Sequence, residues 1–136
     1  MKKQVKTVNN INAPAEQVWA QLRTGEGVNK WLPIITACRV EGNRRYCETA
    51  DGSLKETIIS SDDATMTFRY SIEEQQLLPV TDIVGTMRVE AIDAQSCTLY
   101  WDVEFDIADE QMFPQVEGGI RQIYAAGAEG LGKLAA

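Results

Sequence analysis

The stretch CTLYWDVEFDI, residues 97–107, alternates between apolar and polar side chains along its whole length. A period of two is typical of a β-strand with one buried face and one solvated face. The apolar face consists of Cys97, Leu99, Trp101, Val103, Phe105 and Ile107. The residues between them, expected to face water, are Thr98, Tyr100, Asp102, Glu104 and Asp106. The stretch therefore predicts an antiparallel sheet that is covered on one side only.

The same period of two extends back to residue 34 and predicts five more strands. They are expected over about 34–41, 44–50, 53–60, 65–73 and 80–92. A further strand with looser alternation is expected at 3–11.

Helical patterns occur at two places in the chain. An amphipathic helix is predicted after Pro14, which suits a first helical turn, and a short second helix is expected to end at Trp31. A long helix is predicted from Asp109, a suitable N-cap, to the end of the chain. No linker interrupts residues 1–136, so we expect a single domain.

This order of elements predicts an α+β fold in which a curved antiparallel sheet wraps around the long C-terminal helix. One helix alone cannot fill the concave face of such a sheet, so an internal cavity is expected between them. Gly119 and Gly127 of the helix are interpreted as leaving room for a ligand there, or as marks of a mobile helix end.

Composition excludes several classes of function. The chain has 136 residues, no histidine and a net charge of −7. Without histidine there is no Ser-His-Asp or Cys-His nucleophile and no HExxH zinc site. The negative charge argues against nucleic acid and against an anionic membrane surface. No apolar run is long enough to cross a membrane.

The cysteines and the N-terminus bear on location. The start of the chain has no apolar core like that of a signal peptide, so a cytoplasmic location is expected. Three cysteines without CxxC spacing fit a reducing compartment and provide no metal site. No cofactor is predicted, and the oligomeric state is left open.

Several motifs resemble the START-like helix-grip superfamily, also called SRPBCC, and within it the polyketide cyclase/dehydrase type. The resemblance rests on the pattern I-x-A-P-x-x-x-V-W at residues 11–19, on W-x-P at 31–33, and on the strand segments 53–58, 84–89 and 98–103. It covers the chain from about Lys3 to Leu134. Members of this superfamily bind lipids, sterols, polyketides and other apolar molecules, and some are cyclases. The resemblance implies the helix-grip fold and a ligand cavity, and it assigns no catalytic residue.

Two tight turns predict which side chains face the cavity. A type II′ turn at Gly42-Asn43 pairs Cys38 with Cys47, and a type I′ turn at Asp51-Gly52 pairs Cys47 with Glu56. The inward face then consists of Thr36, Cys38, Val40, Arg45, Cys47, Thr49, Leu54, Glu56 and Ile58.

Glu56 is the most informative of these residues, because a carboxylate that faces an apolar interior is costly unless it is paired. Arg45, placed diagonally on the neighbouring strand, is the expected partner. Glu56 is either a polar anchor or general acid/base for a ligand, or one half of a structural ion pair at the rim. Cys38 and Cys47 are close enough for a cross-strand disulfide, although two separate half-buried thiols are the favoured interpretation.

The leading hypothesis is a carrier or sensor that binds a small, largely apolar molecule between the sheet and the C-terminal helix. The predicted lining residues are Arg45, Cys47, Leu54, Glu56, Ile58, Phe68, Tyr70, Met87, Trp101, Ile120 and Tyr124. A second hypothesis is a cyclase or dehydratase in which Glu56 acts with Tyr70 or Arg45 on an enolate. A third is a protein-interaction accessory without a ligand, whose acidic outer face of Asp102, Glu104 and Asp106 meets a partner.

Overall fold

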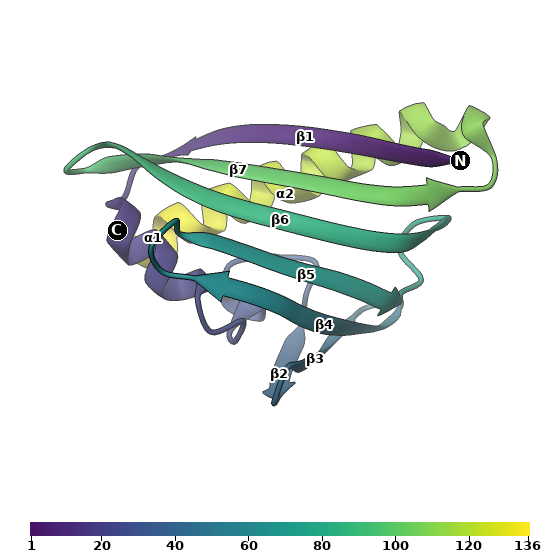
Figure 1. Ribbon diagram of the computed structural model, residues 1–136, viewed down its shortest axis with the longest axis horizontal. Coiled ribbons are helices and arrows are strands. Elements are labelled where there is room, and N and C mark those ends of the chain that lie inside the picture. Colours follow the sequence, from purple (N-terminus) through teal and green to yellow (C-terminus); the bar gives the residue numbers. More distant parts are fainter.

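Seven antiparallel strands form one curved sheet in this computed structural model, which describes all of residues 1–136 (Figure 1). The strands are β1 (Lys2–Ile11), β2 (Ala37–Glu41), β3 (Arg44–Thr49), β4 (Gly52–Asp62), β5 (Thr67–Glu74), β6 (Val80–Asp93) and β7 (Ser96–Ile107). They lie in the order β1-β7-β6-β5-β4-β3-β2, so the first strand of the chain pairs with the last. The sheet predicted from the period of two is confirmed.

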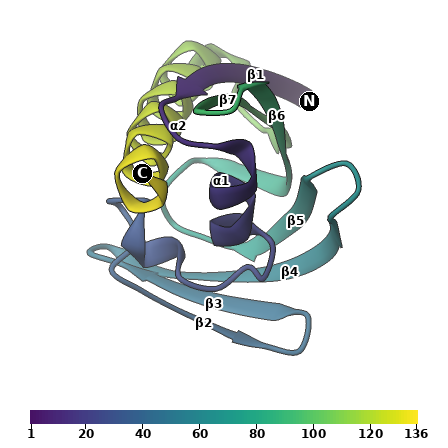
Figure 2. The ribbon, with the colours of Figure 1, turned by 90° about the vertical axis from the view of Figure 1, so that its left-hand side faces the viewer.

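Two helices and two short 3-10 helices complete the chain. They are α1 (Ala15–Leu22), η1 (Val28–Lys30), η2 (Glu110–Met112) and α2 (Phe113–Ala135). The long α2 runs beside β1 on the concave side of the sheet, and α1 lies inside the curve at one end (Figure 2). No helix is both long and apolar enough to span a membrane.

Two expected elements differ most in the residue at which they begin. The strand expected from residue 34 begins at Ala37, because the preceding residues form a turn in which the Ile35 N–H donates to the Leu32 carbonyl at 3.0 Å. Asp109 accepts a hydrogen bond from the backbone N–H of Gln111 at 3.0 Å and therefore caps η2, the short turn that leads into α2.

Burial follows the alternation that predicts β7. All six of its inward apolar residues are at most 3% exposed. Thr98, which the pattern places toward water, is buried as well, and its hydroxyl donates to the Asn10 side chain on β1 at 2.9 Å. The other polar residues of β7 are partly or fully exposed, so the concave face carries the core.

The β2–β3 hairpin has the expected register. Gly42 has a φ of +61°, which a glycine adopts without strain, and Cys38 lies opposite Cys47. The two cysteines are joined as a disulfide, with Cα atoms 4.2 Å apart, whereas the sequence favoured separate thiols. Cys97 remains a free, buried thiol.

The β3–β4 hairpin has a register two residues away from the expected one. Cys47 pairs with Leu54 rather than with Glu56, and Arg45 lies directly opposite Glu56 rather than diagonally. The predicted turn at Asp51-Gly52 is therefore wrong. Because the shift is an even number of residues, the side chains stay on the faces assigned to them.

The observed turn consists of Ala50 and Asp51, and Thr49 explains its position. The Thr49 hydroxyl donates to the carbonyl of Gly52 at 3.0 Å and accepts from the N–H of Asp51 at 3.2 Å. A threonine that bonds the neighbouring backbone can favour a turn at its own position over the one that an Asp-Gly pair would form. The hairpin therefore closes one residue earlier than the Asp-Gly signal indicates.

Two glycines of α2 let the segment after η1 pack directly on the helix. A Cβ atom at Gly130 would collide with the carbonyl group of Trp31. A Cβ atom at Gly127 would lie 3.0 Å from Leu32 and 3.2 Å from Trp31 and Trp101. The space beside Gly127 is thus filled by the protein's own side chains rather than left open for a ligand.

The disulfide predicts the number of reactive thiols. Protein unfolded in urea without reductant should give one reactive thiol per chain, that of Cys97, and three after reduction. The measurement is a colorimetric thiol assay, and Cys97→Ser, which should give none before reduction, is the control. Three reactive thiols without reductant would show that Cys38 and Cys47 are not bonded.

The two environments along α2 predict opposite effects of the same substitution. Gly130→Ala should destabilise the protein by about 1–3 kcal/mol, because the new methyl group meets a backbone carbonyl that cannot rotate away. Gly118→Ala has nothing within 4 Å and should stabilise it by about 0.5–1 kcal/mol. Urea unfolding measures both, and equal effects would contradict the close approach of Trp31 to α2.

Candidate functional site

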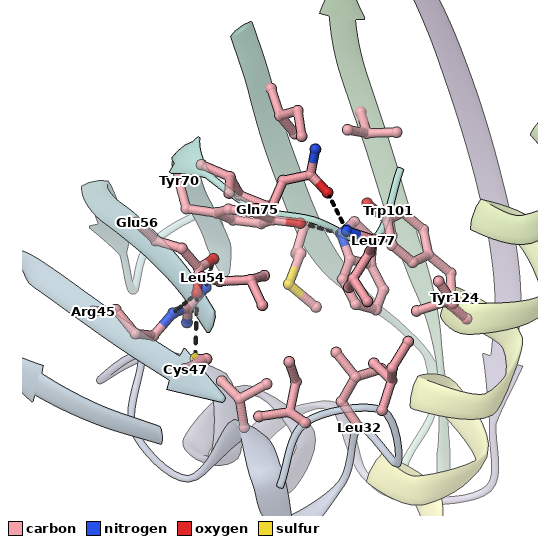
Figure 3. Close-up of a pocket in the computed structure, with 18 of the residues that line it drawn as sticks. Leu32, Arg45, Cys47, Leu54, Glu56, Tyr70, Gln75, Leu77, Trp101 and Tyr124 are labelled. Atoms are coloured by element: carbon pink, nitrogen blue, oxygen red, sulfur yellow. Dashed lines mark hydrogen bonds and ion pairs between the residues drawn. The ribbon is translucent and has the colours of Figure 1, made fainter. Parts of the chain in front are cut away.

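An apolar cavity of about 100 Å³ lies between the concave face of the sheet, α2 and the segment from α1 to β2 (Figure 3). Of the 28 residues that line it, 22 are hydrophobic. Figure 3 shows Arg45, Cys47 and Glu56 on one wall and Trp101 and Tyr124 on the opposite wall. The cavity is where the sequence places it, between the sheet and the C-terminal helix.

Ten of the eleven candidate residues line this cavity. They are Arg45, Cys47, Leu54, Glu56, Phe68, Tyr70, Met87, Trp101, Ile120 and Tyr124. Ile58 does not, and this corrects its assignment. The β4–β5 pairing shifts between Ile58 and Ser60, and the Ile58 side chain lies against Gly25, a residue that itself lines the cavity.

Three lining segments are absent from the predicted lining. One runs from the end of α1 to η1 and contributes Gln21, Leu22, Gly25, Glu26 and Val28. A second is the stretch after η1, which contributes Trp31, Leu32, Ile34 and Ile35. The third is the β5–β6 connection, which contributes Gln75, Leu77 and Leu78. The run Leu77-Leu78-Pro79-Val80 is unusually apolar for an exposed connection, and this signal would have found the third segment.

Gln75 gives the β5–β6 connection a fixed shape. Its amide nitrogen donates to the carbonyls of Leu78 and Val80 at 2.8 and 3.1 Å. Its amide oxygen accepts from the backbone N–H groups of Leu77 and Leu78 at 2.8 and 2.9 Å. One side chain therefore satisfies four backbone groups and holds Leu77 and Leu78 over the cavity.

Arg45 and Glu56 form a buried, bidentate ion pair in the cavity wall. The Arg45 Nε and Nη2 atoms donate to the two Glu56 oxygens at 3.0 and 2.9 Å, and the two side chains are only 8% and 5% exposed. Arg45 Nη1 also donates to the carbonyl of Gly25 at 3.1 Å. The pair neutralises both charges, and it ties the loop after α1 to β3 and β4.

Cys47 lies next to this pair. Its sulfur is 3.3 Å from Glu56 Oε2, a distance at which a thiol would donate a hydrogen bond. In the disulfide the sulfur carries no proton, so the contact is a hydrogen bond only after reduction. Arg45 alone holds Glu56 in the oxidised form.

An exposed carboxylate anchors the loop that follows α1. Asp63 accepts from the Trp19 indole at 2.8 Å and from Arg23 Nε and Nη2 at 3.0 and 2.9 Å. The hydrogen bonds from Arg23 and then from Trp19 lower the pKa of Asp63 to about 2. The loop that contains Gly25 is thereby fixed between the β4–β5 turn at one end and Arg45 at the other.

Three aromatic side chains, those of Tyr70, Trp101 and Tyr124, carry further polar groups of the cavity wall. Tyr124 stacks on Trp101 with ring centres 3.6 Å apart and planes at 6°. The Trp101 indole N–H donates to the Tyr70 hydroxyl at 2.9 Å (Figure 3). Burial raises the pKa of Tyr70, and burial together with the neighbouring Tyr70 raises the pKa of Tyr124 well above its usual value. Both hydroxyls therefore stay protonated at neutral pH.

Gly85 leaves space for the Tyr70 ring. It lies opposite Tyr70 in the β5–β6 pair, and a Cβ atom there would collide with the tyrosine ring and hydroxyl. The missing side chain lets Tyr70 lie across β6 and reach Trp101 on β7. Gly85 is thus a positioning residue for the aromatic wall.

The site can bind an apolar molecule and offer it a few hydrogen bonds. No three His, Cys, Asp or Glu side chains are grouped so as to hold a metal ion. Both Glu56 oxygens are occupied by Arg45, so the carboxylate is a structural partner in this state.

The buried ion pair predicts a strong effect of single substitutions. Glu56→Gln should destabilise the protein by about 3–5 kcal/mol, because it leaves the Arg45 charge buried without a partner. The double variant Arg45→Met, Glu56→Leu should recover most of that loss, since apolar replacements of a buried pair are often neutral. Urea unfolding measures both. A loss below about 1 kcal/mol for Glu56→Gln would mean that water solvates the pair.

Solved structures share this architecture. An uncharacterised protein from Bacillus thuringiensis matches with a TM-score of 0.84, 23% identity, and 96% of this chain and 97% of the other covered. The protein XoxI from Bacillus cereus matches with a TM-score of 0.84, 22% identity, and 97% and 94% covered. Norcoclaurine synthase from Thalictrum flavum, solved in complex with dopamine and hydroxybenzaldehyde, matches with a TM-score of 0.74, 19% identity, and 98% and 86% covered. At these identities the likeness shows the helix-grip fold. No curated protein matches the chain.

The family is shown by the sequence itself. The family model described as polyketide cyclase / dehydrase and lipid transport matches residues 2–136, which is nearly the whole chain. The resemblance inferred from residues 11–19 and 31–33 is confirmed. This chain belongs to the polyketide cyclase/dehydrase and lipid transport family.

Proposed function

We propose that this protein is a carrier or sensor that binds one small, largely apolar molecule in the cavity between the sheet and α2. The observation that supports this most is an apolar space inside an otherwise packed core, with 22 hydrophobic residues among the 28 that line it. Native interiors contain few voids larger than a water molecule, so such a space calls for an explanation. A ligand pocket with a few placed polar groups is the usual one.

The volume limits the size of the ligand. An apolar cavity of roughly 150 Å³ binds benzene, whereas sites for drug-sized ligands measure about 300–1,000 Å³. A cavity of about 100 Å³ is smaller than the benzene site, so at this size it suits a short branched chain. A single ring or a larger ligand requires Leu77 and Leu78, or the segment after η1, to move outward.

Burial alone gives a weak complex for so small a ligand. About 200 Å² of apolar surface at roughly 25 cal/mol per Å² corresponds to about 5 kcal/mol, which is a dissociation constant near 0.2 mM. Tighter binding needs hydrogen bonds from the polar groups of the wall. The tyrosine and tryptophan side chains are the residues available for this.

The enzymatic hypothesis has weaker support. It requires Glu56 to take a proton from a substrate, yet both of its oxygens accept from Arg45. Tyr70 and Tyr124 are buried phenols that can donate hydrogen bonds. The arrangement suits recognition better than general base catalysis.

Native mass spectrometry of protein purified from its own source tests the proposal. We expect a co-purifying small molecule bound at one per chain. Leu54→Trp places a larger side chain in the cavity and should abolish the bound mass. Val8→Trp, at a position 62% exposed on β1, is the matched control and should retain it.

Circular dichroism should confirm that both variants are folded. A bound molecule that persists in folded Leu54→Trp would place it outside this cavity. Repeated absence of any bound molecule from the wild-type protein would favour the accessory hypothesis.

A further inference from the structure

We propose that the ligand of this cavity is an uncharged molecule with a hydrogen-bond acceptor, such as a ketone, aldehyde, ester or lactone oxygen, and that this oxygen accepts from the Trp31 indole. This inference rests on the proposed binding function and specifies the chemistry of the ligand.

The first observation is a buried donor without an acceptor. Trp31 is 4% exposed and lines the cavity, and its Nε1 atom is buried without a hydrogen-bond partner. A buried N–H that stays unpaired costs about 1–3 kcal/mol. The other two indoles are paired, since Trp19 donates to Asp63 and Trp101 donates to Tyr70.

The benzene edge of the Trp31 indole is fixed by α2. Its Cζ3 atom packs against Gly127, and the ring meets Trp101 edge-on with centres 5.9 Å apart. The pyrrole edge, which carries the N–H, therefore lies on the side of the ring away from Gly127. The donor is held in place by packing and lacks only an acceptor.

The aromatic wall offers further polar groups. The Trp101 indole N–H donates to the Tyr70 hydroxyl at 2.9 Å. A hydroxyl can both donate and accept, so Tyr70 and Tyr124 can add a hydrogen bond to a ligand oxygen without requiring one. The Trp31 N–H can only donate, so it is the group that selects for an acceptor.

The charges of the cavity exclude charged ligands. The charged side chains of the lining are Arg45, Glu56 and Glu26, and Glu26 is exposed. Arg45 and Glu56 neutralise each other through two hydrogen bonds. A carboxylate ligand therefore finds no free cation in the lining, and an ammonium ligand finds a free anion only in the exposed Glu26. Burying either without a counter-charge is strongly unfavourable.

Together these features fit a small uncharged acceptor. A carbonyl or ester oxygen satisfies the Trp31 N–H and adds no charge, and the rest of the molecule fills the apolar space. A hydrocarbon of the same shape fills the space equally well but leaves Trp31 unpaired.

Two isosteric probes separate hydrogen bonding from burial. Acetophenone carries a carbonyl oxygen, and 2-phenylpropene has a CH₂ group in its place. Titration of the wild-type protein, followed by the indole ¹H–¹⁵N signals, should give an affinity for acetophenone about 3- to 10-fold higher. Acetophenone alone should move the Trp31 indole proton downfield. Benzoate and benzylamine should bind more weakly than either probe.

Trp31→Phe removes the donor and keeps an aromatic ring, so it should bind both probes with equal affinity. Trp19→Phe, whose indole bonds Asp63 outside the cavity lining, is the matched control and should retain the preference for acetophenone. Should Trp31→Phe fail to fold, the wild-type indole shifts still decide, with the Trp31 N–H signal linked to its own ring protons, whose benzene edge contacts Gly127.

The outcomes distinguish this inference from the proposed function. Binding of 2-phenylpropene as tight as that of acetophenone, or tighter binding of benzoate or benzylamine, would overturn the inference and leave a binding cavity. Failure of every probe to bind the wild-type protein would overturn the proposed function itself.

Discussion

The structure depends on a mismatch between the width of the sheet and the width of the helix it holds. Seven strands at roughly 4.8 Å spacing span about 29 Å, whereas a helix with its side chains is about 10 Å across. The long α2 can therefore cover only part of the concave face, and it lies beside β1 and β7. The rest is covered by α1, by the segment after η1 and by the β5–β6 connection. The space that these irregular pieces leave between them is the cavity.

The polar groups inside the cavity divide into two kinds. Arg45 donates hydrogen bonds to both oxygens of Glu56 and to the carbonyl of Gly25. The pair therefore connects the sheet to the loop that contains Gly25. The Trp31 indole is different, because its buried N–H has no acceptor. The cavity thus contains one pair of polar side chains that satisfy each other and one donor that is unpaired.

The sequence predicts the regular elements well and the irregular ones poorly. Strict alternation in residues 97–107 defines β7 and its buried face, and the pattern at residues 11–19 predicts the start of α1. Thr49 bonds its own turn, and this local competition moved the β3–β4 register by two residues. Trp31 reaches the cavity from a connection whose path depends on a tertiary contact with Gly130, and Gln75 reaches it from a loop shaped by its own side-chain hydrogen bonds. A hydrophobic period in the sequence predicts neither kind of contact.

The two-residue shift of the β3–β4 hairpin also bears on how such a cavity can diversify. Sliding one strand by two residues leaves the set of inward side chains unchanged and alters only their neighbours. With the expected register Glu56 would lie opposite Cys47, whereas in the protein it lies opposite Arg45. A short insertion or deletion at an exposed hairpin tip can therefore change which polar groups meet inside the pocket, without any substitution in the pocket itself.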